Sequence, residues 1–149
     1  MKITKLAVAV CALLLVTACG HKGYSGGGES VSAAMEELQN KVGDRVFFSL
    51  DDSRLTPEAK ATLAQQAQFM KSHSNLKFVI EGHCDERGTR EYNLGLGERR
   101  ANAVISYLSG LGVEESTMTP ISYGKEHPAV VGHHEDAWKQ NRRAVTVVK

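Results

Sequence analysis

Two charged residues near the middle of the chain, Asp85 and Arg100, are the strongest candidates for binding a ligand. Asp85 follows a short apolar run typical of a strand, so we expect its carboxylate at the mouth of a loop, solvated and ionised. Arg100 shares one face of a predicted helix with Asn93 and Gly97, because the three lie at i+7, i and i+4. A glycine between an amide and a guanidinium would leave a shallow notch with hydrogen-bond donors on either side.

The ligand that suits such a notch is a small zwitterion. Its ammonium would pair with Asp85, and its carboxylate would enter the planar fork of Arg100. The alternative is a structural ion pair between the two residues that fastens the loop to the helix. Because Arg100 is expected to flank the apolar stripe of its helix, we predict that Arg100→Ala abolishes binding and leaves the fold intact.

A metal site around His83 and the histidine-rich segment 133–136 is another interpretation of these residues. Adjacent residues on a strand point to opposite faces, and the sequence contains neither HExxH nor paired CxxC spacing. We therefore expect no metal and no cofactor.

A hydrolytic enzyme is the main competitor in functional class. Hydrolysis needs a nucleophile or water activated by a matched base. His83 and Cys84 are sequence neighbours whose side chains should diverge, and no serine has a histidine partner by motif. The sequence therefore favours a binding protein that catalyses no reaction.

The N-terminal residues indicate export. Lys2 and Lys5 precede an apolar run over residues 6–16. A helix that crosses a bilayer needs about 20 apolar residues, so this run is typical of a secretory signal. The same length argues against an anchor of the flagellar-stator kind, which needs a transmembrane helix.

The end of this signal resembles a bacterial lipobox, with Cys19 as its acylated residue. We therefore predict a signal peptide over residues 1–18, followed by a lipidated N-terminus, a flexible glycine-rich tether and a short helix over residues 19–41. Gly20, where an aspartate would favour the inner membrane, indicates lipid anchoring in the outer membrane with the domain facing the periplasm.

The charge balance excludes one class of partner. Without residues 1–18 the chain has 16 basic and 17 acidic residues, because Lys2 and Lys5 are lost from 18 bases and no acid is lost. A net charge of −1 gives no electrostatic reason to expect nucleic acid.

The elements that must position Asp85 and Arg100 alternate between strands and helices in residues 42–149. Alternation of this kind is typical of an α/β sandwich, here with two main helices packed on a mixed four-stranded sheet. The predicted elements are an entry helix at 31–42, strands at 46–50, 76–80, 118–123 and 144–148, and main helices from Thr56-Pro57 to about 73 and over 92–111.

Several segments within residues 47–148 resemble the peptidoglycan-associated lipoproteins (Pal) of the OmpA-like domain superfamily. They are Glu-Gly-His-x-Asp-Glu-Arg-Gly at 81–88, Tyr-Asn-x-x-Leu-Gly-Glu-Arg-Arg-Ala at 92–101, Ser-Tyr-Gly-Lys-Glu at 122–126, Pro-Ala-Val-x-Gly-His at 128–133 and Asn-Arg-Arg-Ala-Val at 141–145. Their number and order make the resemblance specific, and the lipobox agrees with it.

The resemblance implies non-covalent binding of peptidoglycan through the meso-diaminopimelate of its stem peptide, and so a tether between outer membrane and cell wall. It assigns this ligand to Asp51, Asp85, Asn93, Leu96 and Arg100, with Leu96 on the floor of the pocket. It also implies the Tol proteins as partners, particularly the periplasmic TolB, within the Tol-Pal system of envelope integrity and cell division. Cys84 departs from the small residue usual in the family, and its thiol is expected to be open to oxidation.

Overall fold

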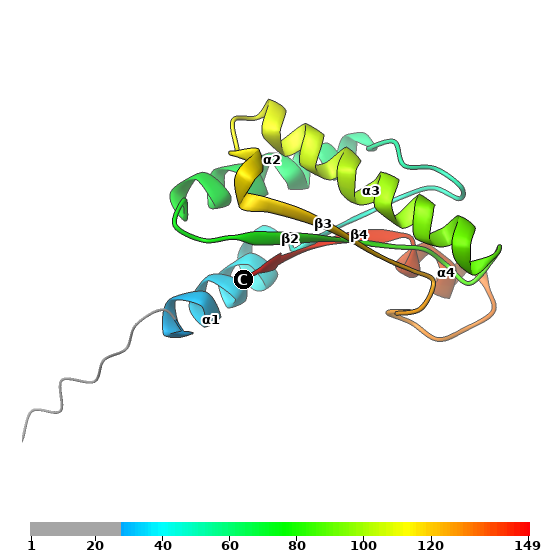
Figure 1. Cartoon of the computed structure of the whole chain (residues 1–149). Helices are drawn as coiled ribbons and strands as arrows, with labels where there is room; N and C mark the ends of the chain where they lie inside the picture. Colours follow the sequence, from blue (N-terminus) through cyan, green and yellow to red (C-terminus); the bar gives the residue numbers. More distant parts are fainter. Residues whose placement is uncertain (1–27) are drawn as a thin grey trace, which may run out of the picture.

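A four-stranded sheet with two long helices on one face forms the centre of the fold in the computed structural model, which describes residues 28–149 (Figure 1). The strand order is β1-β4-β2-β3; β2 is parallel to β3, and β4 is antiparallel to both β1 and β2. The predicted α/β sandwich with a mixed four-stranded sheet is confirmed. The strands are β1 Arg45–Phe47, β2 Phe78–His83, β3 Met118–Gly124 and β4 Arg143–Val148.

The predicted signal peptide, the lipidation site Cys19 and the tether up to residue 27 lie outside the described residues. Helix α1, Gly28–Glu37, starts three residues before the predicted position, because apolar periodicity detects only the positions that carry apolar side chains. A π-helical turn, Leu38–Val42, continues it, and Gly43 closes the turn with a positive φ of 94°. Ala34 and Leu38 are buried in the core, so this N-terminal helix packs with the sheet.

The two main helices begin at side-chain caps, of which the sequence indicated only the first. Helix α2, Pro57–Ser72, starts after Thr56, whose hydroxyl accepts a hydrogen bond from the Ala59 N–H at 3.2 Å. Helix α3, Arg90–Gly110, starts after Thr89, which caps the N–H of Tyr92 in the same way. Both predicted helices are confirmed to within two residues at each end.

Two strands differ in length from the prediction. Strand β2 was expected to end at Ile80 but continues to His83, because β3 and β4 supply hydrogen-bond partners on both of its edges. Strand β1 was expected to reach Leu50 but ends at Phe47. Beyond that point the chain turns away from the sheet, and Asp51 adopts a positive φ of 53°.

Helix α4, Glu135–Asn141, was not predicted as an element. Only two of its seven residues, Ala137 and Trp138, have apolar side chains, and two are too few to show a helical period. It lies at the same end of the sheet as the start of α3 (Figure 1).

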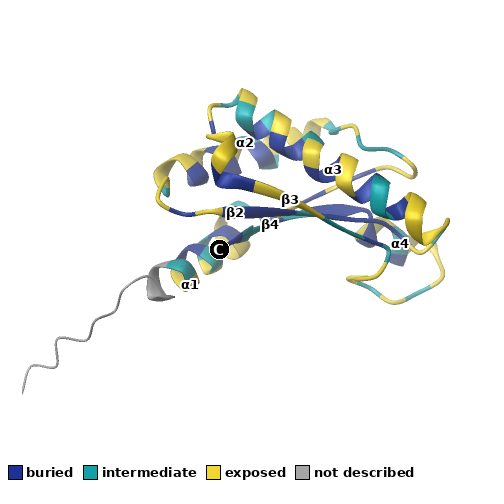
Figure 2. Ribbon diagram, viewed as in Figure 1, coloured by how far each residue is buried: buried dark blue, intermediate teal, exposed yellow. Residues whose placement is uncertain are grey.

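The core lies between the sheet and its two main helices, where the buried residues form a continuous layer (Figure 2). Gly82 on β2 and Gly97 on α3 set the height of the helix above the sheet, since a Cβ atom at Gly82 would lie 1.8 Å from the main-chain oxygen of Gly97. This close approach brings the first turns of α3 directly over the end of β2. Within residues 28–149, no helix has the length and apolar character needed to cross a membrane.

Candidate ligand-binding site

A cavity of about 360 Å³ opens where β2 ends and α3 begins. All five residues expected to bind a ligand line it: Asp51, Asp85, Asn93, Leu96 and Arg100. The other lining residues, most of which the sequence did not single out, are Leu50, Cys84, Arg87, Gly88, Tyr92 and Arg142. The cavity is therefore built by the β1–α2 loop, the β2–α3 loop, the first turns of α3 and the junction between α4 and β4.

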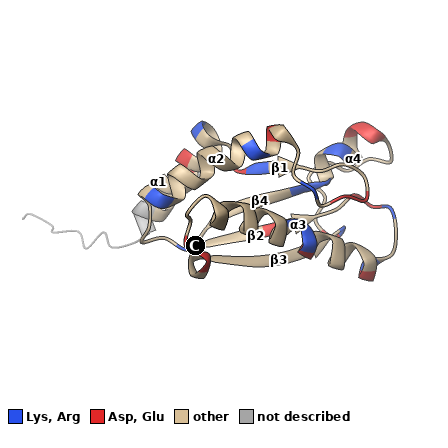
Figure 3. Ribbon diagram, turned by 90° about the horizontal axis from the view of Figure 1, so that it is seen from above, with Lys and Arg blue, Asp and Glu red and all other residues tan. Residues whose placement is uncertain are grey.

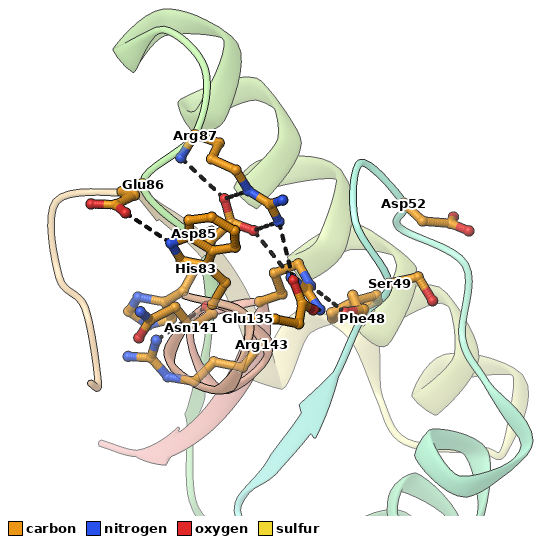
Figure 4. Close-up of polar contacts among 12 residues, drawn as sticks. Phe48, Ser49, Asp52, His83, Asp85, Glu86, Arg87, Glu135, Asn141 and Arg143 are labelled. Carbon is orange, nitrogen blue, oxygen red and sulfur yellow. Dashed lines mark hydrogen bonds and ion pairs between the residues drawn. The ribbon is translucent and has the colours of Figure 1, made fainter. Parts of the chain in front are cut away.

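One side of the cavity, here termed the acidic half, consists of Asp85 with Arg87 and Arg142, and Glu135 lies behind the two arginines. Figure 4 shows Arg87 beside Asp85, with Glu135 near both. Arg87 donates to both carboxylate oxygens of Asp85, from Nε at 3.1 Å and from Nη2 at 2.6 Å, and its main-chain N–H donates at 3.1 Å. Arg142 Nη1 donates to Asp85 Oδ2 at 3.3 Å and Nη2 donates to Glu135 at 2.5 Å.

The expectation of a solvated Asp85 is wrong, because only 4% of its side chain is exposed. Burial opposes ionisation, but the hydrogen bonds from Arg87 and Arg142 outweigh it and hold the pKa of Asp85 below its ordinary value. The carboxylate is therefore ionised at neutral pH, as expected, although guanidinium groups and not water stabilise its charge.

The opposite side, termed the basic half, consists of Arg100 and three main-chain carbonyl groups. Its guanidinium donates to His83 O at 2.7 Å, Asp52 O at 2.9 Å and Ser49 O at 3.1 Å, and it lies 5.1 Å from the centre of the Phe48 ring. These bonds hold the loop after β1 against the end of β2, which is why β1 ends early. Among the described residues, no carboxylate lies within 4 Å of the Arg100 guanidinium.

Arg100 is completely buried, so the expected position beside the apolar stripe of its helix is wrong. The alternative of an ion pair between Asp85 and Arg100 is also wrong, since Asp85 pairs with Arg87 and Arg142. Burial lowers the pKa of Arg100. A guanidinium nevertheless stays protonated in proteins, and the cavity therefore contains a buried positive charge whose partners are dipoles.

Asn93 and Gly97, which were expected to form the notch with Arg100, have structural roles. Asn93 is buried and its amide donates to the carbonyls of Arg87 at 2.8 Å and Thr89 at 3.1 Å, so it shapes the β2–α3 loop. Gly97 does not line the cavity; it makes the close contact with β2. Between Asn93 and Arg100 the cavity is therefore lined by the buried side chain of Leu96, the neighbour of Gly97.

The mouth of the cavity is partly apolar. Leu50 and Tyr92 are 57% and 45% exposed, and both line the opening. The Tyr92 hydroxyl donates to the carboxylate of Asp51, which joins the β1–α2 loop to the first turn of α3. Asp51 is therefore an exposed rim residue, and Asp85 lies deeper.

Cys84 lies in the wall of the cavity and is only 3% exposed. Its thiol donates to the main-chain oxygen of Asn93 at 3.3 Å, and burial raises its pKa. Because oxidation proceeds through an accessible thiolate, the burial of Cys84 argues against the oxidation that the sequence left open.

Arg87 and Arg142 are the charged cavity residues that sequence reasoning missed. Arg142 joins α4 to the chain beyond β1, because it donates to Glu135 and, at 3.0 Å, to the main-chain oxygen of Phe48. Its contact with Asp85 joins residues 57 positions apart. No local spacing signals such a pair; only the adjacency of β4 to β2 brings it together.

Charged residues are spread over the described part of the chain. In the view of Figure 3, basic and acidic positions are interspersed along the ribbon of residues 28–149. Within the described part of the chain, no group of three His, Cys, Asp or Glu side chains converges in a way that would hold a metal ion.

Comparison with known proteins decides which family this architecture belongs to. Residues 47–143 match the model of the OmpA family, and they include both halves of the cavity. The chain belongs to the OmpA family. Within it, the chain is 48% identical over 123 residues to the peptidoglycan-associated lipoprotein of Rhizobium meliloti, covering 83% of this chain and 70% of that protein.

Two further relatives carry the same name. The peptidoglycan-associated lipoprotein of Brucella melitensis is 46% identical over 145 residues, which covers 96% of this chain and 86% of that protein. The crystal structure of the peptidoglycan-associated lipoprotein from Burkholderia pseudomallei has a TM-score of 0.73 at 42% identity, covering 78% of this chain and 99% of that one. The resemblance inferred from the motifs is confirmed, and membership of this family of binding proteins confirms that the chain is not an enzyme.

Proposed function

We propose that this protein binds peptidoglycan non-covalently, through the meso-diaminopimelate residue of the stem peptide, and thereby tethers the outer membrane to the cell wall. The observation that carries the proposal is the presence of Asp85 and Arg100 in one cavity, with opposite charges and different surroundings. The names of the relatives, peptidoglycan-associated lipoproteins, support the choice of polymer. The side-chain end of meso-diaminopimelate carries an ammonium and a carboxylate on one carbon, so a single residue supplies both charges.

In this proposal the carboxylate of the ligand binds Arg100. A guanidinium has five N–H groups, and three of those of Arg100 donate to main-chain carbonyls. One N–H on Nη1 and one on Nη2 remain for a ligand. A carboxylate there would place a negative charge beside a buried positive charge, which is a strong charge-assisted contact.

The ammonium of the ligand binds Asp85, whose low pKa keeps it ionised at neutral pH. Leu96 would contact the methylene groups of the ligand, and Asn93 would hold the loop that carries Asp85. Asp51 and Tyr92 would contact the neighbouring part of the stem peptide at the mouth.

The tether also needs an anchor, and we assign that role to acyl chains on Cys19. Stable attachment requires more than one chain, as a triacylated N-terminal cysteine provides. Many copies on one sacculus would give a strong linkage from exchangeable contacts. Competition by TolB and other Tol proteins for the same surface, and a role in cell division, belong to this proposal through the family resemblance alone.

Co-sedimentation with purified sacculi tests the proposed function. We expect the wild-type protein to pellet, and Asp85→Asn and Arg100→Lys to stay in solution. Both variants keep nearly the original side-chain volume, and Arg100→Lys keeps the charge but loses the fork. Asn102→Ala changes an exposed residue of α3 that does not line the cavity, and this control variant should pellet like the wild type. If both cavity variants pellet like the wild type, this cavity is not the binding site.

A further inference from the structure

The carboxylate of Asp85 has no free acceptor site in this structure. Oδ1 accepts from the main-chain N–H and Nε of Arg87, and Oδ2 accepts from Nη2 of Arg87 and Nη1 of Arg142. A carboxylate offers about four lone-pair sites, so these four donors fill it. An ammonium that is to bind Asp85 must therefore displace one of the two guanidinium groups.

Arg142 is the less movable of the two. Its side chain is 8% exposed, and it also donates to the oxygen of Phe48 and to Glu135. Its departure would break its contacts with the residue that follows β1 and with α4 together. Arg142 therefore belongs to the permanent wall of the cavity.

Arg87 is placed to leave. Its side chain is 33% exposed, and Glu135 Oε2 lies 3.9 Å from its Nη2, close to the limit of an ion pair. Its guanidinium lies 4.0 Å from the ring centre of Trp138, over the face of the indole. The indole is itself fixed, because Trp138 Nε1 donates to Glu86 at 2.8 Å and Glu86 pairs with His133. A second anion and an aromatic platform thus adjoin the position that Arg87 holds.

We propose that Arg87 is an internal competitor: in the free protein its guanidinium occupies the ammonium site on Asp85, and ligand binding transfers it to Glu135 along the face of Trp138. This inference rests on the proposed function, since it presumes a ligand ammonium at Asp85. Exchange of one cation for another on Asp85 yields little free energy, so the net gain comes from the ligand carboxylate on Arg100. Arg87 thereby weakens each single contact and favours ligands that carry both charges.

Calorimetric titration with a stem tripeptide containing meso-diaminopimelate tests the transfer. We expect Arg87→Ala to bind about two- to fivefold more tightly than wild type, the range that corresponds to a partly exposed ion pair. Arg87→Lys, which keeps a competing cation, should stay near the wild-type affinity. Glu135→Gln should bind more weakly in the wild-type background and have a smaller effect in Arg87→Ala, because the receiving anion matters only when Arg87 is present.

The fluorescence of Trp138 gives a second readout, because it is the chain's single tryptophan. Ligand should change its emission in wild type and much less in Arg87→Ala. If Arg87→Ala binds more weakly than wild type, or with unchanged affinity, Arg87 does not compete and the inference is wrong. If the wild type does not bind the tripeptide, or Asp85→Asn binds it equally well, the proposed function itself fails.

Discussion

The acidic half and the basic half of the cavity hold their charges in different ways. Asp85 is surrounded by side chains, and one of these, Arg87, is partly exposed. Arg100 is surrounded by main-chain carbonyls of the β1–α2 loop and of β2. One half is therefore built from groups that can exchange partners, and the other is part of the framework of the fold.

This difference explains how a binding site can be both rigid and responsive. The carbonyls of Ser49, Asp52 and His83 fix the position of Arg100 before any ligand arrives, so its contact with a carboxylate is preorganised. The acidic half keeps its charge neutralised until a cation replaces Arg87. The comparison predicts that substitutions in the basic half affect folding and binding together, whereas those in the acidic half affect mainly binding.

The largest effect is expected for Arg100→Ala. Three buried carbonyl groups would lose their donors and the β1–α2 loop its attachment, so the free energy of unfolding should fall by about 3–5 kcal/mol. Denaturant unfolding followed by circular dichroism measures this. A loss below about 1 kcal/mol would show that Arg100 is peripheral to the fold, as the sequence had indicated.

The pH dependence of stability offers a second test at His83, the residue whose main-chain carbonyl accepts a hydrogen bond from Arg100. The His83 side chain is 3% exposed and stacks on Tyr123, with ring centres 5.4 Å apart. Burial, together with the nearby charges of Arg143, His127 and Arg45, lowers the pKa of the imidazole to about 3. The pKa is lowered although the carboxylate of Glu81 lies 3.4 Å from Nε2. The folded state thus stays neutral at pH values where the unfolded chain binds a proton.

Because this pKa is lower in the folded than in the unfolded state, stability falls as the pH decreases from about 6.5 towards 3. Between pH 6.5 and 5 the loss should reach about 2 kcal/mol. His83→Phe keeps an aromatic ring and should remove this loss of stability between pH 6.5 and 5. Urea unfolding of both proteins at the two pH values measures the free energy of unfolding. An equal loss in wild type and variant would contradict the buried neutral imidazole.

Asp85→Asn should have a smaller effect on folding, about 1–2 kcal/mol at neutral pH, because Glu135 remains as an anion for both arginines. The pKa of Asp85 is lower in the folded state, so its stabilising contribution is present at neutral pH and is lost as the pH falls below about 4. The difference in the free energy of unfolding between wild type and Asp85→Asn should therefore become smaller below about pH 4. A difference that grows on acidification would mean that Asp85 is protonated in the folded protein.

The sequence predicted the framework well where local signals were sufficient. Thr56-Pro57 marks the start of α2, and a run of mostly β-branched residues marks β4, so element types followed from capping and local composition. Residue types also brought Asp85 and Arg100 to one cavity in the prediction. Their surroundings did not follow, because burial of Arg100 depends on the Gly82–Gly97 contact and on a loop about 50 residues away.

Arg142 illustrates the same limit. In the sequence it stood out only as part of the segment 141–145, and only the placement of β4 beside β2 brings it to Asp85. Helix α4 was missed for the complementary reason, since a seven-residue helix has too few apolar positions to show a period.

The most direct test of the two-halved site compares two stem tripeptides that differ only in their third residue, meso-diaminopimelate or lysine. Both offer a side-chain ammonium to Asp85, and only the first has a carboxylate on the same carbon as that ammonium, where Arg100 can bind it. Calorimetric titration of the purified protein should show binding of the diaminopimelate peptide at least about tenfold tighter, a ratio that Arg100→Lys reduces. Equal affinities for the two peptides would contradict the assignment of Arg100 to the ligand carboxylate and, with it, the division of labour between the two halves.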